Sequence, residues 1–246
     1  RSAYRSSLSE EQLDAMVEKT KALEAYQEAG EDPKALECIP MLKRSDIKKE
    51  AAKIVNEELT VDNSLFLYHD VCTNGIGYVD LMFKTDSIAP EQIPYLGLLK
   101  SVLGYVDTEH YTYGELFNEI NANTGGINCG VEVFDRADST EEFQAMFSVR
   151  GKALYTKMDF LFKMIGEILN SSKLEDTKRL YEIVASVKSR AQVNLTGAGH
   201  STAVLRAAAY SSPMAAFQDE MAGIGYYQFI EKLEKDFEQR KEETVE

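Results

Sequence analysis

The glycine pair in residues 121–134, NANTGGINCGVEVF, is the first candidate for chemistry, because Gly-rich turns can cradle phosphates. Phosphate-binding loops run from a strand through the turn into a helix, so that backbone N–H groups at the helix N-terminus face the anion. Here the expected order is helix, Gly125-Gly126, strand. An anion at this turn would therefore meet the negative end of the helix dipole, which disfavours binding. The chain also has neither GxGxxG nor GK[ST]. We therefore interpret the pair as a glycine C-cap that leads into a strand.

Histidine and cysteine are the next residue types that could do chemistry, and the chain has three of each. No CxxC, CxxH, HxxxH or HExxH spacing occurs, so neither a disulfide framework nor a zinc site made by one helix is expected. A reducing compartment fits this cysteine usage. The sequence around His200, GAGHST, and around His110, DTEHYTYGEL, favours local hydrogen bonding and solvated charge over a catalytic base or a complete metal site. No GxSxG nucleophile motif occurs.

The composition limits the classes of partner. The 246 residues carry a net charge of −14, which disfavours nucleic acid because phosphate neutralisation needs a basic face. No apolar run is long enough to span a membrane. The first residues, RSAYRSSLSEEQ, have neither an initiator Met nor an apolar secretion segment, so we expect a piece of a longer protein.

The elements that would position these residues follow from hydrophobic periodicity. Residues 1 to about 44 predict a helical hairpin whose first helix starts with a capping box, Ser9 with Gln12, and ends at Gly30. A weak strand is expected near Ala52 to Leu59, and then an antiparallel pair, residues 64–71 with 76–85, joined at Asn74-Gly75.

The second half of the chain predicts helices at 91–102 and 112–124, then strands at 126–134 and 142–151 joined by DRADST. Several helices follow, one of which has Ser212 as N-cap and Pro213 as its first residue. This order predicts an α+β fold, in which helices cover an antiparallel or mixed sheet mainly on one face.

Several motifs occur in an order that resembles a known family. They are LKRSDI, YHDVCTNGIGYVDLMFKTD, IPYLGLLKSVLGYVDTEHYTYGELFNEINANTGGI and GHSTAVLRAAAYSSPMAAFQDEMAGIGYYQFIEKL. Together they resemble the presequence-protease-like branch of the pitrilysin/insulinase zinc metallopeptidases. The resemblance implies a helical-hairpin linker, residues 1–45, and the third of four homologous α+β domains, residues 46–246. In that family two halves close like a clamshell around a peptide, and the first domain holds an HxxEH zinc motif plus a distant Glu.

The resemblance also assigns positions in this chain. When Gly104 is set against the glycine that follows the zinc helix, Tyr95, Leu98 and Leu99 take the places of His, Glu and His. Because tyrosine is a poor zinc ligand and leucine is none, the resemblance implies no metal site here, and Glu182 at the distant Glu position would be a surface carboxylate. The TGGINCGV turn resembles the entry to the strand that borders substrate in the catalytic domain, which makes Thr124, Gly125, Gly126 and Asn128 a substrate-proximal scaffold.

These inferences predict a non-catalytic segment of a larger zinc metalloendopeptidase that degrades peptides. The segment would form part of the chamber wall and hinge, and zinc would belong to the parent's catalytic domain. The expected partners are the catalytic half of the same parent and unfolded peptides, with no nucleic acid and no membrane. A cytoplasmic location is expected, with an organelle matrix as the alternative. Two other functions stay open, a core-type scaffold subunit and a peptide-binding module without peptidase activity.

Overall fold

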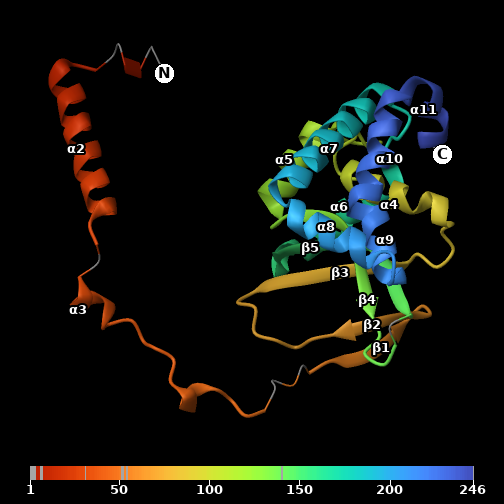
Figure 1. The fold of residues 1–246 in the computed structure, drawn as a ribbon, viewed down its shortest axis with the longest axis horizontal. Helices are drawn as coiled ribbons and strands as arrows, with labels where there is room; N and C mark the ends of the chain where they lie inside the picture. The colour runs from red at the N-terminus through yellow and green to blue at the C-terminus, as the bar shows by residue number, and fades with distance from the viewer. Residues whose placement is uncertain are drawn as a thin grey trace. The chain divides into compact units, whose positions relative to one another are not determined.

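The computed structural model describes residues 4–5, 8–30, 32–50, 53, 55–139 and 141–245. By their contacts the residues form two compact units, 1–70 and 71–246 (Figure 1). The domain boundary predicted at residue 45 stays a prediction. Within the described ranges no helix is both long enough and apolar enough to cross a membrane.

The first unit contains helix α2, Glu10–Glu28, and the predicted capping box at its start is confirmed. The Gln12 N–H donates to Ser9 Oγ at 3.2 Å, and the Ser9 N–H donates to Gln12 Oε1 at 3.0 Å. The predicted second helix is only a single turn, α3, Pro33–Leu36. Pro40 explains its length, because proline lacks the N–H that a helix needs and disfavours helical backbone in Ile39 before it.

The first unit also contains a hairpin of β1, Glu57–Val61, and β2, Ser64–Tyr68. Its two-residue turn, Asp62-Asn63, has φ of 46° and 66°, as a type I′ turn requires. β1 corresponds to the weak strand predicted near residues 52–59, although Ala52 lies outside the described residues.

The predicted pairing across Asn74-Gly75 is wrong. The turn itself forms, with φ of 51° and 83°, but the strand after it pairs elsewhere. That strand is β3, Ile76–Lys84, and its partner is β5, Phe143–Leu154. Pairing with β5 lets Val79 and Leu81 of β3 pack against the core, which pairing with the short β2 would not.

The second unit is built on a three-stranded antiparallel sheet of order β3-β5-β4, where β4 is Ile127–Asp135. The predicted pairing of β4 with β5 is confirmed, and the loop between them is described except for Thr140. Among the described strands β5 is central, so β3 and β4 form the edges. Alternate residues of each strand face the helices, among them Cys129, Val131, Ala145, Phe147 and Val149.

The described residues of the second unit form eight α-helices, and Figure 1 shows these helices on one side of the sheet. They are α4, Ile93–Val102; α5, Tyr113–Asn123; α6, Met158–Ser171; α7, Thr177–Gly197; α8, Gly199–Ala208; α9, Pro213–Ala222; α10, Ile224–Lys235; and α11, Phe237–Val245. One apolar core lies between the sheet and α4, α5, α6 and α9, and a second lies among α4, α7, α10 and α11. Ser212 caps α9 as predicted, and the α+β fold class is confirmed.

Candidate binding pocket

Helix α4 carries the three positions that the resemblance aligns with a zinc motif. Leu98 is 4% exposed and belongs to the second core, while Leu99 packs against the first. The Tyr95 hydroxyl donates to Glu243 Oε1 at 2.9 Å and accepts from the Arg240 guanidinium at 2.9 Å. Burial and the hydrogen bond to Glu243 raise the pKa of Tyr95, so this phenol stays protonated.

These side chains do not fit a zinc ion. Two are apolar groups committed to the cores, and the third already has two hydrogen-bond partners on α11. Across the described parts of the chain, no group of three or more His, Cys, Asp or Glu residues is placed to hold a metal.

Two histidines that the sequence singled out, His110 and His200, lie in different surroundings. His110 lies with Nδ1 3.0 Å from Glu167 Oε2, whereas the sequence around it predicted solvated charge. His200 lies in the first turn of α8, whereas the sequence placed it between helical stretches.

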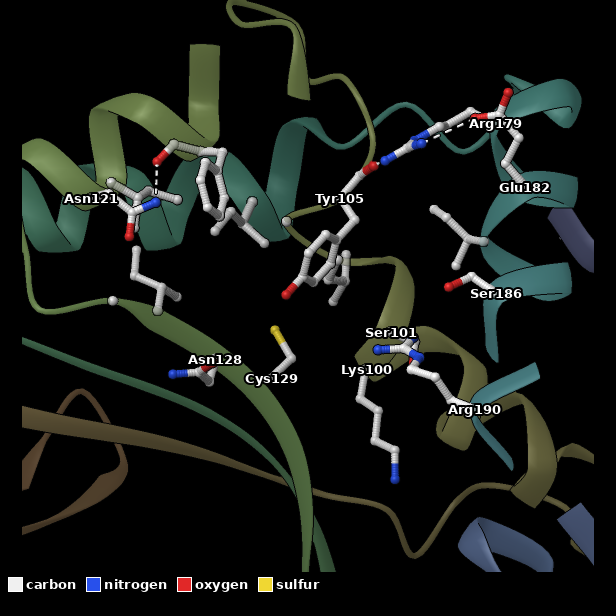
Figure 2. Close-up of a pocket in the computed structure, with 18 residues that line it drawn as sticks. Lys100, Ser101, Tyr105, Asn121, Asn128, Cys129, Arg179, Glu182, Ser186 and Arg190 are labelled. Atoms are coloured by element: carbon white, nitrogen blue, oxygen red, sulfur yellow. Dashed lines mark hydrogen bonds and ion pairs between the residues drawn. The ribbon is translucent and has the colours of Figure 1, made fainter. Parts of the chain in front are cut away.

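A pocket of about 430 Å³ opens beside α4, between α5, β4 and α7 (Figure 2). Its polar wall comes from four elements, with Lys100 and Ser101 on α4, Asn121 on α5, Cys129 on β4, and Glu182 and Arg190 on α7. Gly126 and Asn128, two of the predicted substrate-proximal residues, also line it, and their role toward a substrate stays a prediction. The volume lies within the range of about 300–1,000 Å³ that is usual for ligand pockets.

The glycine turn forms one rim of this pocket. Thr124 ends α5, with its N–H and its Oγ1 both donating to the Ile120 carbonyl, at 2.9 and 2.7 Å. The Gly126 N–H then donates to Thr124 Oγ1 at 3.0 Å, and Gly126 has φ of +106°. The predicted order of helix, turn and strand is confirmed, but the C-cap residue is Thr124 rather than a glycine, because its side chain can accept from and donate to the turn.

Gly125 is held against the sheet, and a side chain there would have to displace that of Lys152. Its N–H donates to the Lys152 carbonyl at 2.7 Å, and a Cβ built on it would lie 2.7 Å from the Lys152 side chain. This N–H is therefore occupied by the protein and is not presented to an anion. The turn is a structural connection, and the pocket beside it is the place where a ligand could bind.

The charges of the pocket are unevenly paired. Arg179 has a full set of partners, since Nη1 lies 3.0 Å from Glu182 Oε2, Nε donates to the Tyr105 carbonyl at 2.9 Å, and the guanidinium lies 4.0 Å from the Tyr113 ring centre. Lys100 and Arg190 have no acidic partner within ion-pair distance among the described residues. Burial lowers the pKa of Lys100, as expected for an ammonium group partly removed from water without a carboxylate beside it.

Cys129 is the only cysteine among the described residues that line the pocket, and we expect its thiol to be unreactive. Burial raises the pKa of the Cys129 thiol to about 11, so the thiolate is scarce at neutral pH. Without a thiolate, neither nucleophilic attack nor soft-metal ligation is expected. The pocket is suited to binding rather than to covalent chemistry.

Sequence reasoning did not identify Lys100, Arg190 or Cys129 as pocket residues. Lys100 and Arg190 lie about ninety residues apart, and only the packing of α4 against α7 brings them to one pocket. Glu182, by contrast, was singled out by the resemblance and does line the pocket. No local spacing could have indicated the two cations, because each reads as an ordinary polar residue of an amphipathic helix.

Comparison with known proteins places the fold. The family described as "Peptidase M16C associated" matches residues 2–233, and the chain belongs to this family. The predicted resemblance to the presequence-protease-like branch is thereby confirmed.

Three relatives illustrate the similarity. The chain is 35% identical to Protein HypA of Clostridium perfringens, over 94% of this chain and 24% of the relative. It is 29% identical to Presequence protease 1, chloroplastic/mitochondrial, of Arabidopsis thaliana, over 94% of this chain and 21% of the relative. It is 28% identical to Presequence protease, mitochondrial, of Yarrowia lipolytica, over 97% and 24% respectively. The chain thus spans less than a quarter of the length of each of these relatives.

Proposed function

We propose that this chain is a non-catalytic segment of a larger zinc metalloendopeptidase that degrades peptides, and that it forms part of the substrate chamber wall and hinge. The observation that carries the proposal is the packing of Leu98 and Leu99 into the two cores at the aligned zinc-motif positions. A helix that carries apolar side chains packed in the cores at two of the three aligned ligand positions serves as scaffold. Catalytic zinc would then be held by another domain of the parent.

Membership of a peptidase-associated family supports this assignment. Two of the relatives carry the name presequence protease, and this chain spans only 21% and 24% of them. A parent of similar length would have room for a catalytic half, which we propose as the main partner of this chain. The compartment would be cytoplasm or an organelle matrix, and the two presequence proteases are named for mitochondria and chloroplasts.

Unfolded peptides are the proposed substrates of the parent, and the charge of this chain supports a preference among them. A net charge of −14 would attract basic peptides into a chamber that this chain helps to enclose. The same charge supports the absence of a nucleic-acid partner.

The proposal is tested with the purified chain and with the full-length parent. The chain alone should hold no stoichiometric zinc by elemental analysis and should not cleave a fluorogenic unstructured peptide. The parent should cleave that peptide, and deletion of this segment should abolish cleavage. One tightly held zinc per chain, or cleavage by the chain alone, would contradict the proposal.

The parent's own sequence separates this function from a core-type scaffold subunit. An HxxEH motif upstream of this segment supports the peptidase assignment, whereas a parent without that motif would be a scaffold of the same fold. The alternative function, a peptide-binding module without peptidase activity, would require that the pocket beside α4 bind a peptide.

A further inference from the structure

The pocket beside α4 has an excess of positive side chains, although the chain as a whole is acidic. Its lining includes three cationic side chains, Lys100, Arg179 and Arg190, and one carboxylate, Glu182. Since Glu182 pairs with Arg179 at 3.0 Å, the charges of Lys100 and Arg190 are left without an acidic counterpart among the described residues. In a chain of net charge −14, two unpaired cations in one concave site indicate an anionic ligand.

The two cations reach the pocket from different helices. Figure 2 shows Arg190 extending from α7 with its guanidinium toward the middle of the pocket, while the Cys129 thiol points from β4 toward the same space. Ser186 precedes Arg190 by one helical turn on α7 and also lines the pocket. Lys100 lies on α4, where it is half-buried and lines the pocket, and Figure 2 shows its ammonium group directed away from the Arg190 guanidinium.

The rest of the wall indicates that the anion is attached to an apolar body. Three side chains with apolar surface open to water line the pocket together with the polar groups: Phe117 is 57% exposed, Tyr105 is 53% exposed, and Ile127 is half-buried. A free inorganic ion would leave this apolar surface in water, whereas an aliphatic side chain would cover it. The Arg190 guanidinium has a planar fork that matches a carboxylate through two parallel hydrogen bonds.

We propose that this pocket binds the C-terminal residue of a peptide, with its carboxylate on Arg190, with Lys100 adding positive charge to the site, and with its apolar side chain against Phe117, Tyr105 and Ile127. The peptide class rests on the proposed function, because each hydrolysis of a peptide bond releases a new C-terminal carboxylate. The Ser186 hydroxyl and the Asn128 side-chain amide line the same pocket and are available to the adjoining peptide groups. The site would hold cleaved products or the trailing ends of substrates within the chamber.

The test measures binding to the chain of residues 1–246 by calorimetry. The probes are acetyl-Ala-Ala-Leu as the free acid, the same peptide as its C-terminal amide, and inorganic phosphate. The acid should bind, and the amide should bind at least about tenfold more weakly because it lacks the charge that Arg190 recognises. Raising the ionic strength should weaken binding of the acid.

Variants assign the binding to the pocket. Arg190→Gln should weaken binding of the acid about tenfold, as the loss of one charge-assisted hydrogen bond predicts, and Lys100→Gln should weaken it less, because Lys100 contributes its positive charge without a direct hydrogen bond. Lys178→Gln is the matched control, since Lys178 lies on α7, is exposed and does not line the pocket. Far-UV circular dichroism checks the fold of each variant. If Lys100→Gln does not fold, Arg190→Gln still decides, because Arg190 is exposed.

Three results would overturn the proposal. They are equal affinity for acid and amide, unchanged affinity in Arg190→Gln, and phosphate binding more tightly than the peptide acid, which would make this a general oxyanion site. Failure here is distinguishable from failure of the proposed function. Zinc content and peptide cleavage report on the latter, and neither depends on affinity for a C-terminal carboxylate.

Discussion

At the scale of single residues, the buried carboxylates of the described chain have charged or hydrogen-bonding partners that two cations of the pocket lack. Asp219 is 1% exposed, lies 2.6 Å from Arg206 Nη1, and accepts from the Ile224 and Gly225 N–H groups at 3.0 and 3.1 Å, at the start of α10. A buried charge is tolerated when it is paired in this way. Lys100 and Arg190 lack such partners among the described residues, which is why they indicate a ligand rather than a structural role.

Glu167 is the second buried carboxylate, and it holds the segment before α5. It is 8% exposed, and Oε1 accepts from the His110 N–H at 3.2 Å, while His110 Nδ1 lies 3.0 Å from Oε2. Hydrogen bonds from the Thr108 side chain and from the His110 backbone lower the pKa of Glu167 below its ordinary value. The carboxylate form is therefore favoured in the folded protein.

This lowered pKa predicts a pH-dependent contribution to stability. A group whose pKa is lower in the folded than in the unfolded state stabilises the fold above its unfolded pKa and loses that effect as pH falls through its folded pKa. Glu167→Gln should therefore lower the free energy of unfolding by about 2 kcal/mol at pH 7, where it removes charge-assisted hydrogen bonds. The difference should shrink as pH falls below the ordinary glutamate pKa of about 4.3, because the unfolded chain is protonated first, and it should be lost once pH has passed the lowered pKa of the folded state. Urea unfolding followed by circular dichroism at both pH values measures it.

Glu109→Gln is the control for this prediction. Glu109 is a neighbouring exposed glutamate for which no side-chain hydrogen bond or ion pair is found among the described residues. Its replacement should change the unfolding free energy by less than about 0.5 kcal/mol at either pH. A Glu167→Gln difference that is equal at pH 7 and at low pH would contradict the assigned role of the charge.

At the scale of elements, the sequence predicts those parts of the fold that depend on local chemistry. The capping box at Ser9 and the cap at Ser212 are correct because a cap needs only residues three positions apart. The β4–β5 pair is correct because both strands alternate cleanly and are joined by a short polar loop. The hairpin at Asn74-Gly75 is wrong because a turn sequence fixes the backbone of the turn but not the partner of the strand that follows it.

The pocket is less predictable than the fold, for a physical reason. Its charged residues come from α4 and α7, and their meeting depends on how closely these helices pack. Close packing of helices depends on single small residues, and the sequence around such a residue does not indicate which helix packs against it. The resemblance identified α4 and Glu182 as important positions, but it gave no indication that Lys100 and Arg190 would be left unpaired.

Gly97 shows how one residue sets the packing of α4. A Cβ built on Gly97 would lie 2.6 Å from Cε2 of Tyr226 on α10 and 2.9 Å from the carbonyl oxygen of Met221 on α9. We predict that Gly97→Ala lowers the free energy of unfolding by about 1 to 2 kcal/mol, because the clash with a backbone oxygen and a buried ring outweighs the better helix propensity of alanine. Urea unfolding of the purified variant measures the change.

Gly166→Ala in the interior of α6 is the matched control. Outside the helix backbone, the nearest atom to a Cβ built there is Asn170 Nδ2 at 4.0 Å, so alanine meets no clash. The same substitution should stabilise the chain by about 0.5 to 1 kcal/mol at this position. If both variants were stabilised alike, α4 would not approach α9 and α10 as closely as described.

At the scale of the whole molecule, the apolar core is confined to one of the two units. The buried hydrophobic residues of the described chain all lie between Leu96 and Phe237, within the second unit. In the first unit, α2 has no buried residue, and every position of β1 and β2 is exposed. Because burial of apolar surface is the main source of stability, the second unit should fold without the first.

We therefore predict that residues 71–246 alone unfold in one cooperative urea transition, with a free energy of unfolding within about 0.5 kcal/mol of the full chain. Far-UV circular dichroism should give the same midpoint for both chains, because both unfold the same two cores. Limited proteolysis of the full chain should remove α2 before any cut in α4–α11, because proteases cleave segments with little buried structure first. A lower midpoint or a broader transition for the shorter chain would show that residues 1–70 stabilise the core, and the linker would then be an integral part of the folded domain.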